Sequence, residues 1–184
     1  MALIKAGLDF STLAMDGANL ALCTTVDTTN HPEYPLQPIQ LGTRTLATDA
    51  GEYVYCQTAG LYAIGTVGIL SNDGTWTFTA MTTSSATVSG NMVGVMSQVA
   101  SVTTTPTTSL YDCLWVQIGG AVPGVLVASG TSINSLLYST TSAGTLNSTS
   151  ASGAVLITGI VTTTTATSAS AQPGVMIFPQ VLLT

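Results

Sequence analysis

Histidine, the usual general base of hydrolytic triads, occurs once in this chain, at His31. A Ser-His-Asp triad needs that base on a rigid scaffold within reach of the nucleophile. His31 instead opens a proline-rich stretch, residues 31–38, whose composition favours an extended, polyproline-like course. We therefore predict that His31 is a solvent-exposed linker residue and that the chain has no triad.

Carboxylates are the next groups that could do chemistry, because a pair of them can hydrolyse a glycosidic bond. The candidates all adjoin expected turns or strand starts, which are ordinary solvated positions: Asp49, Glu52, Asp73 and Asp112. Asn72 and Asp73 could offer oxygen ligands to Ca²⁺, but their spacing is not that of an EF-hand loop. Asp73-Gly74 is also a turn signal, so we assign this pair to a turn.

The cysteines do not suggest a metal centre. Cys23, Cys56 and Cys113 are widely spaced, and no two of them have metal-ligand spacing. We interpret them as small buried hydrophobic residues or free thiols. The chain also lacks a glycine-rich phosphate loop. The sequence thus predicts no catalytic, cofactor-binding or metal-ligating residues, no cofactor, and a protein that is not an enzyme.

Charge is scarce and unevenly distributed. Only 5% of residues are charged, against about 25% in an ordinary soluble domain, and residues 113–184 contain no Lys, Arg, Asp, Glu or His. Lys5 and Arg44 are the only cations in a chain of net charge −6, so nucleic acid and anionic membranes are excluded as partners. No apolar run reaches the roughly 18 residues that a spanning helix needs. Arg44 is expected to pair locally with Asp49 or Glu52, or alternatively with a carboxylate of a neighbouring subunit.

The elements that would position these residues are predicted to be β-strands. Short apolar or alternating segments recur between turn residues at intervals of about 8 to 12, which is typical of sandwiches and barrels. We expect an all-β fold: a single β-barrel or β-sandwich domain of short antiparallel strands over residues 39–184, preceded by an extended N-terminal arm over residues 1–38. The expected strands are residues 52–57, 62–70, 75–79, 93–99, 114–118, 125–128, 136–139, 155–161 and 175–178.

The segment 75–79 shows the clearest alternation. Trp76 and Phe78 are expected to point inward and the threonines between them outward, with Asp73-Gly74 closing the hairpin before them. Regular threonine arrays also occur in ice-binding proteins, but this one covers a single strand. Alternation likewise predicts that Trp115 points inward.

An internal echo links two strands that lie sixty residues apart. Tyr55-x-Gln57-x-x-Gly60 is similar to Trp115-x-Gln117-x-x-Gly120. Either the β domain contains an internal duplication or the similarity arose by chance in a sequence of low complexity. Two copies do not predict a propeller or a solenoid, which need three or more repeats.

Several segments together resemble one protein family, the head decoration proteins of tailed bacteriophages. The resemblance covers roughly residues 39–184, in order, and each motif is weak by itself. The segments are residues 51–59 (GEYVYCQTA), 63–67 (AIGTV), 90–95 (GNMVGV), 111–120 (YDCLWVQIGG), 137–141 (LYSTT), 144–146 (GTL) and 178–179 (FP).

The resemblance implies a β-rich cement protein that binds the outer surface of an icosahedral capsid. Its implied partners are the major capsid protein and further copies of itself, as a homotrimer. Its implied location is the exterior of the virion, after synthesis in the host cytoplasm. The arm, residues 1–38, matches the family least well, and its role in reaching capsid or sibling subunits is inferred.

Two other function classes compete with a structural virion protein. A carbohydrate- or surface-binding β module, such as an adhesin or fiber-base domain, would use exposed Trp76 or Trp115 as stacking platforms, which the expected inward orientation disfavours. An enzyme would have to rely on Asp73 and Asp112, and it is the weakest of the three.

Overall fold

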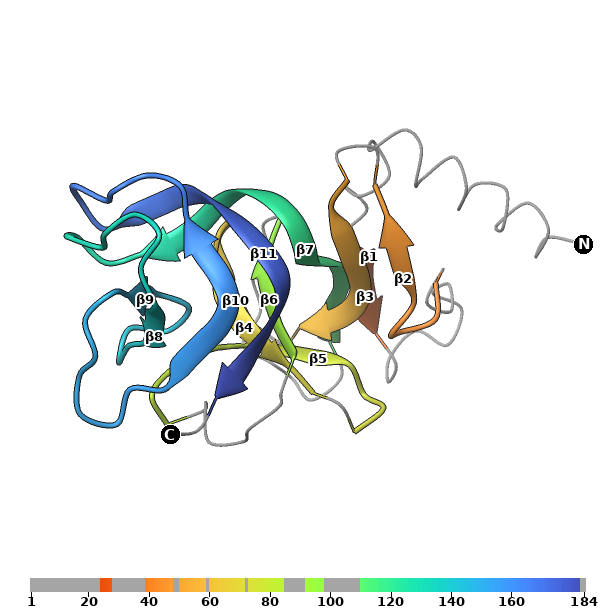
Figure 1. Ribbon diagram of the computed structural model, residues 1–184. Coiled ribbons are helices and arrows are strands. Elements are labelled where there is room, and N and C mark those ends of the chain that lie inside the picture. The colour runs from red at the N-terminus through yellow and green to blue at the C-terminus, as the bar shows by residue number, and fades with distance from the viewer. Residues whose placement is uncertain are drawn as a thin grey trace, which may run out of the picture.

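The computed structural model describes residues 24–27, 39–47, 50–58, 60–71, 73–84, 92–97 and 110–182, and these residues form strands, turns and loops without a helix. The expected all-β fold is confirmed. One sheet contains all the strands (Figure 1). The strands are β1 (Thr24–Asp27), β2 (Arg44–Leu46), β3 (Glu52–Thr58), β4 (Val67–Leu70), β5 (Thr77–Ala80), β6 (Met92–Met96), β7 (Leu110–Val127), β8 (Leu137–Ser139), β9 (Leu146–Asn147), β10 (Leu156–Thr162) and β11 (Ser170–Leu182).

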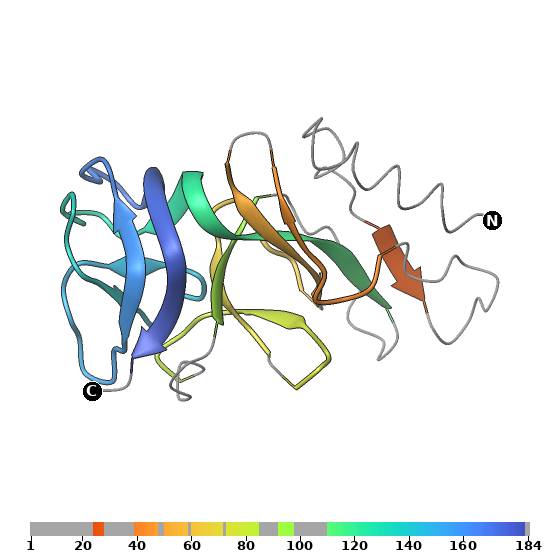
Figure 2. The same ribbon diagram turned by 45° about the vertical axis from the view of Figure 1, so that its right-hand side comes forward.

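Strand pairing closes into two rings that share β7, and a further pairing of β11 with β6 joins them directly. The amino-side ring runs β7–β3–β5–β4–β6 and returns to β7, and the carboxyl-side ring runs β7–β11–β10–β8–β9 and returns to β7. Strands β1 and β2 lie outside the rings, paired with β7 and β3 respectively. Figure 2 shows β7 running from the carboxyl-side strands toward β1. Of the two expected architectures, these closed ladders agree with the β-barrel, because a β-sandwich keeps two separate sheets.

Strand β7 is one element where two short strands were expected, at 114–118 and 125–128. It spans 18 residues and continues through Gly119-Gly120, with a bulge at Ile118, where its register against β3 shifts. Gly120 has a φ of 88°, which glycine adopts without strain. Gln117 holds the bulge, since its Nε2 donates to the carbonyl oxygens of Gly119 (3.0 Å) and Ala121 (2.7 Å). The bulge lets one strand pair with β3 along its first half and with β11 along its second half.

Strand β11 is also longer than expected, with 13 residues instead of the predicted 175–178. Its register against β7 shifts between Gln172 and Gly174, so that Pro173 of β11 and Pro123 of β7 both lie at the irregularity. Proline has no N–H to donate to a ladder and is tolerated at such a bulge. Two pairings, β3 with β5 and β7 with β9, are parallel, which corrects the purely antiparallel expectation.

Strands β4 and β6 form a wall between two cores. Val67 and Ile69 of β4 and Val93 and Val95 of β6 face the aliphatic core of the carboxyl-side ring. The opposite faces of these strands border the core of the amino-side ring, which contains Phe78, Leu114, Val116 and further buried side chains.

The wall is thin because two of its residues are glycines, Gly68 of β4 and Gly94 of β6, which pair with each other in the ladder. A methyl group at Gly68 would collide with the ring of Phe78, and one at Gly94 would collide with Cγ1 of Val116.

A third cluster covers the other face of β3 and β7. It contains Ile39, Tyr53, Tyr55, Cys113 and Trp115. The sheet is therefore buried on both faces where β3 and β7 meet, which explains why these strands read as nearly continuous apolar sequence.

Part of the range expected to be an arm takes part in the sheet. Thr24–Asp27 form β1, which pairs antiparallel with the first residues of β7. The rest of the expected arm, residues 1–23 and 28–38, lies outside the described residues, as does His31. Within the described ranges, no helix is long and apolar enough to cross a membrane.

Candidate interaction surface

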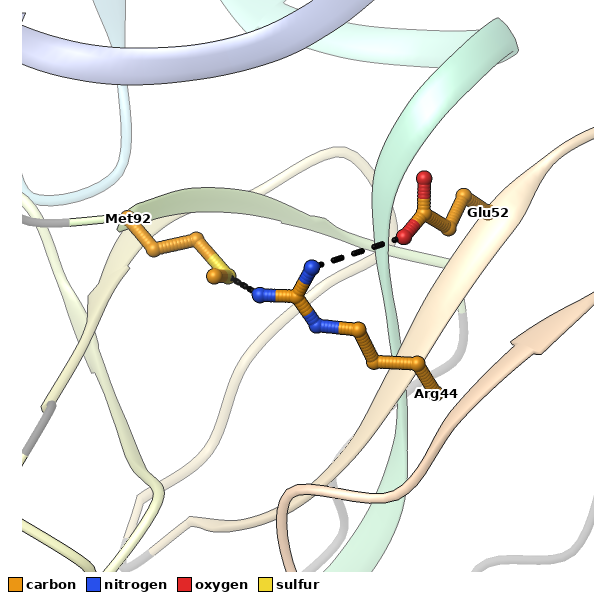
Figure 3. A network of polar contacts seen from close by, with 3 residues as sticks. All are labelled: Arg44, Glu52 and Met92. Carbon is orange, nitrogen blue, oxygen red and sulfur yellow. Dashed lines mark hydrogen bonds and ion pairs between the residues drawn. The ribbon is translucent and has the colours of Figure 1, made fainter.

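Arg44, Glu52 and Asp73, the Arg, Asp and Glu side chains that the structure describes, all take part in local contacts. Arg44 of β2 and Glu52 of β3 form an ion pair, with Arg44 Nη1 3.7 Å from Glu52 Oε1. Arg44 Nη2 lies 4.0 Å from Sδ of Met92 in β6 (Figure 3). The expected local pair of Arg44 is thus confirmed with Glu52, while Asp49 lies outside the described residues. The guanidinium ties β2 and β3 to β6 at the end of the amino-side ring.

An open depression of about 400 Å³ lies beside this pair, lined by Arg44, Thr45, Leu46 and Glu52. Its only carboxylate among these residues is already paired with its only cation. These described lining residues therefore offer no free acid–base pair, and the depression is too open to exclude water from a reaction.

Asp73 belongs to the turn between β4 and β5, as expected. Its Oδ1 accepts hydrogen bonds from the backbone N–H of Thr75 (3.0 Å) and from the hydroxyl of Thr75 (2.6 Å). Hydrogen bonds from the side chain and backbone of Thr75, and from Ser71, lower the pKa of Asp73. Gly74 follows with a φ of 89°, so the Asp73-Gly74 turn is confirmed. The carboxylate is a turn acceptor and not part of a pair.

The remaining candidate groups are also placed. Asp112 lies in β7 opposite Thr58, but its side chain, like Asn72, lies outside the described residues. Cys56 and Cys113 are buried and form no disulfide, and burial raises the pKa of the Cys56 thiol. Cys23 lies outside the described residues. In the part of the chain that the structure describes, no three of His, Cys, Asp and Glu come together as a metal site.

Trp115 cannot be a surface platform, whereas Trp76 is partly exposed. Trp115 is 0% exposed and meets Tyr55, its cross-strand partner, edge to face at 5.2 Å between ring centroids. The two copies of the sequence echo therefore lie side by side as antiparallel neighbours. Trp76 is only half-buried, against the amino-side core; it has a φ of 50° and precedes β5, so it lies outside the strand in which alternation was expected.

An exposed apolar face lies on β11 and β7, and we call it the outer strip. Its two largest members are Val175, 38% exposed, and Ile177, 72% exposed. They lie two residues apart on β11, opposite Ala121 and Gly119 of β7. The smaller exposed members are Ala171 and Pro173 of β11 and Ala121 and Pro123 of β7.

Sequence reasoning missed the outer strip. Residues 175–178 were interpreted as one short apolar run, whereas alternate residues from 171 to 177 are exposed and Gly174 and Met176 between them are buried. A period of two across Ala171, Pro173, Val175 and Ile177 was the available signal.

The border of the outer strip is electrically neutral. Ile177 pairs with Gly119, which on its other side pairs with Glu52, and Glu52 is neutralised by Arg44. Leu46, also strongly exposed, pairs with Glu52 on β2. A row across four strands thus runs through Ile177, Gly119, Glu52 and Leu46. Its two ends are exposed aliphatic side chains, and the carboxylate between them is paired with the neighbouring Arg44.

The loops of the carboxyl-side ring use hydroxyl groups where other proteins use charges. Thr140 donates to the carbonyl of Thr145 (2.9 Å), Thr131 to that of Ala128 (2.8 Å), and Ser129 to that of Thr167 (3.1 Å). These hydroxyl donors are satisfied within the chain, so a contact that removes water from them leaves no donor unpaired.

No family model, curated protein or solved structure matches this chain.

Proposed function

We propose that this protein is a structural component of a virion, a decoration or cement protein that binds the outer surface of a tailed-phage capsid. The observation that carries the proposal is the carboxyl-side ring. It is a closed β structure without a single charged side chain in residues 113–184, with internally bonded hydroxyls and exposed aliphatic groups on its outside.

Such a surface suits a permanent contact better than a catalytic cycle. Burying an unpaired charge costs several kcal/mol, and leaving a buried donor without a partner costs about 1–3 kcal/mol. The carboxyl-side ring offers no charge in residues 113–184, and its hydroxyls at Ser129, Thr131 and Thr140 already donate within the chain. Large repeated contacts between symmetric copies are what a capsid cement needs.

The sequence resemblance to phage head decoration proteins supplies the partner. On this proposal the partner is the major capsid protein, the site of action is the capsid exterior, and the protein turns over no substrate. The ion pair of Arg44 with Glu52 and the turn acceptor Asp73 support the fold and take no part in chemistry.

A binding experiment with phage heads tests the proposal. Purified protein is mixed with heads assembled without it and sedimented through a sucrose cushion, at low and at high salt. We expect the protein to pellet with the heads in both conditions, because salt screens charged contacts and leaves uncharged ones in place. Protein that remains in the supernatant with heads that lack it would refute the proposal.

A further inference from the structure

Strand β2 presents an open edge of the sheet. Every strand of the two rings has a neighbour on both sides, whereas within the described residues β2 pairs with β3 alone and ends the strand order. Its three residues are exposed, half-buried and exposed in turn. An unpaired edge is a template on which an extended chain can add as a further strand.

The ladder with β3 leaves alternate backbone groups of β2 pointing outward. The residues that flank β2 both bond toward β3: the carbonyl of Thr43 accepts an N–H of β3 at 2.8 Å, and the N–H of Ala47 donates to the carbonyl just before β3 at 2.9 Å. Thr45 follows the same alternation. Arg44 and Leu46 therefore direct their N–H and C=O groups away from β3.

The side chains of this edge indicate which segment it can accept. Arg44 and Leu46 lie two residues apart, so they project from the same face of the strand. Leu46 is 65% exposed, and the side chain of Arg44, the only cation that the structure describes, is 46% exposed. The open depression of about 400 Å³ leaves room beside both of them.

Arg44 keeps hydrogen-bonding capacity for a ligand. A guanidinium has five N–H donors. Here Nη1 lies 3.7 Å from Glu52, beyond hydrogen-bond length, and Nη2 contacts the weak acceptor sulfur of Met92 at 4.0 Å. A strand added to β2 would run two strand spacings, about 10 Å, from β3. A carboxylate on it could bond to Arg44 without crowding Glu52, and a cation in its place would be repelled.

We propose that β2 is a docking edge to which an extended segment of another protein adds as a strand, with an acidic side chain opposite Arg44 and an aliphatic one opposite Leu46. Backbone hydrogen bonds supply the affinity, and these two side chains supply the selectivity. The edge lies at the end of the molecule away from β8 and β9 (Figure 1). The inference goes beyond capsid attachment and does not depend on it.

Binding of a defined peptide to the full chain tests the inference. The probe is a fluorescein-labelled peptide of eight residues that alternates threonine and valine, with aspartate in place of one central valine. A matched peptide carries asparagine there. Fluorescence anisotropy should show saturable binding, about tenfold tighter for the aspartate peptide, because hydrogen bonds to charged groups are stronger than neutral ones.

Two substitutions at one position separate strand pairing from side-chain contact. Leu46→Pro removes an outward N–H but no bond to β3, and proline is tolerated at such edge positions. It should bind the aspartate peptide about tenfold more weakly than Leu46→Ala, which loses the side chain and keeps the N–H. Arg44→Gln should bind both peptides alike. Circular dichroism and melting temperatures show that each variant is folded.

Amide hydrogen exchange gives a second readout on the unmodified chain. The N–H groups of Arg44 and Leu46 should exchange fast in the free protein and slowly with the aspartate peptide bound, while that of Thr45 is slow in both. Protection of both outward groups in the free protein would overturn the inference, because a second copy or another segment of this chain would then already cover the edge.

Three binding results would also overturn it. They are no saturable binding up to about 1 mM, the weak end of measurable affinities, equal affinity of the wild type for the two peptides, and equal affinity of Leu46→Pro and Leu46→Ala for the aspartate peptide. Head binding is read separately. A protein that pellets with heads and ignores the peptide loses only this inference, and one that binds the peptide and ignores heads loses only the proposed function.

Discussion

The two rings share β7 but differ in the charge of their surfaces and in the composition of their cores. The described charged side chains, Arg44, Glu52 and Asp73, lie on β2, β3 and the β4–β5 turn, whereas the strands and loops of residues 113–182 carry none. The cores differ in the same way. Aromatic side chains such as Phe78 and Trp115 fill the amino-side clusters, and the carboxyl-side core contains only Val, Ile, Leu, Met and Ala.

The turns show how a ring can dispense with charge. The β4–β5 turn uses the carboxylate of Asp73 as its acceptor, whereas carboxyl-side loops use hydroxyls of Thr131 and Thr140 that donate to carbonyls. The carboxylate and the hydroxyls both form hydrogen bonds with backbone groups, but only the carboxylate titrates. The carboxyl-side ring thus keeps its fold without charged side chains in residues 113–182, and the proposed capsid contact would use this uncharged surface.

The largest expected effect comes from truncating either core. Phe78→Ala in the amino-side core and Leu137→Ala in the carboxyl-side core should each cost about 3–5 kcal/mol, since both side chains are fully buried. Both tryptophans of the chain belong to the amino-side clusters, so fluorescence reports that ring and far-ultraviolet circular dichroism reports both.

Because β7 and the β4–β6 wall belong to both cores, each variant should unfold in urea in one transition that is seen alike by the two probes. A Leu137→Ala variant whose fluorescence midpoint stays at the wild-type value, while its dichroism midpoint falls, would show that the rings are independent.

The wall between the cores gives the next largest effect. Gly94→Ala should destabilise the protein by about 1–3 kcal/mol through overpacking, because the added methyl meets Val116 Cγ1. Combining it with Val116→Ala removes the collision, so the double variant should cost less than the sum of the single variants. Thermal melts measure all three, and strictly additive costs would mean that the two residues are not in contact.

Strain in the β4–β5 turn should produce a smaller effect. Gly74→Val should cost about 1–2 kcal/mol, because a β-branched residue resists a left-handed backbone conformation. The space around the residue is open, with no atom within 4 Å of an added Cβ, so the cost isolates the backbone. Gly74→Asn, which tolerates this conformation better, should recover most of the loss. An unchanged melting temperature for Gly74→Val would count against the turn.

The smallest effect is a pH dependence confined to the amino-side ring. Hydrogen bonds lower the pKa of Asp73 in the folded state, so its stabilising contribution is present above the unfolded-state pKa and is lost as the pH falls through the folded-state pKa. Asp73→Asn should flatten that part of the stability–pH profile.

Thr140→Val, on the carboxyl-side loop, should lower stability by the same amount at every pH, because the lost hydroxyl does not titrate. Urea titrations at a series of acidic pH values measure both variants. A profile for Asp73→Asn that keeps the wild-type slope would mean that another group titrates.

Local features of the fold could be predicted from the sequence. The Asp73-Gly74 turn, the strand at Glu52–Thr58, the burial of Trp115 and the pairing of Arg44 with Glu52 all follow from residues that are neighbours in the chain or from alternation. Each depends on short-range physical chemistry that a single sequence contains.

Long-range features could not be predicted. Two short strands were expected at 114–118 and 125–128, and only the pairing of β7 with both β3 and β11 makes them one strand that continues past a bulge at Ile118. The fit of Gly94 against Val116 depends on the same closure. The outer strip was hidden for a related reason: its exposure depends on which face of β11 the carboxyl-side ring encloses, and a shift of one residue would reverse it.

Cryo-electron microscopy of phage particles assembled with this protein tests the account most directly. We predict density for the β domain on the outside of the capsid shell, with copies contacting the shell and each other through uncharged surfaces of the carboxyl-side ring. Particles that bear no such density, while the protein remains soluble in the same lysate, would contradict it.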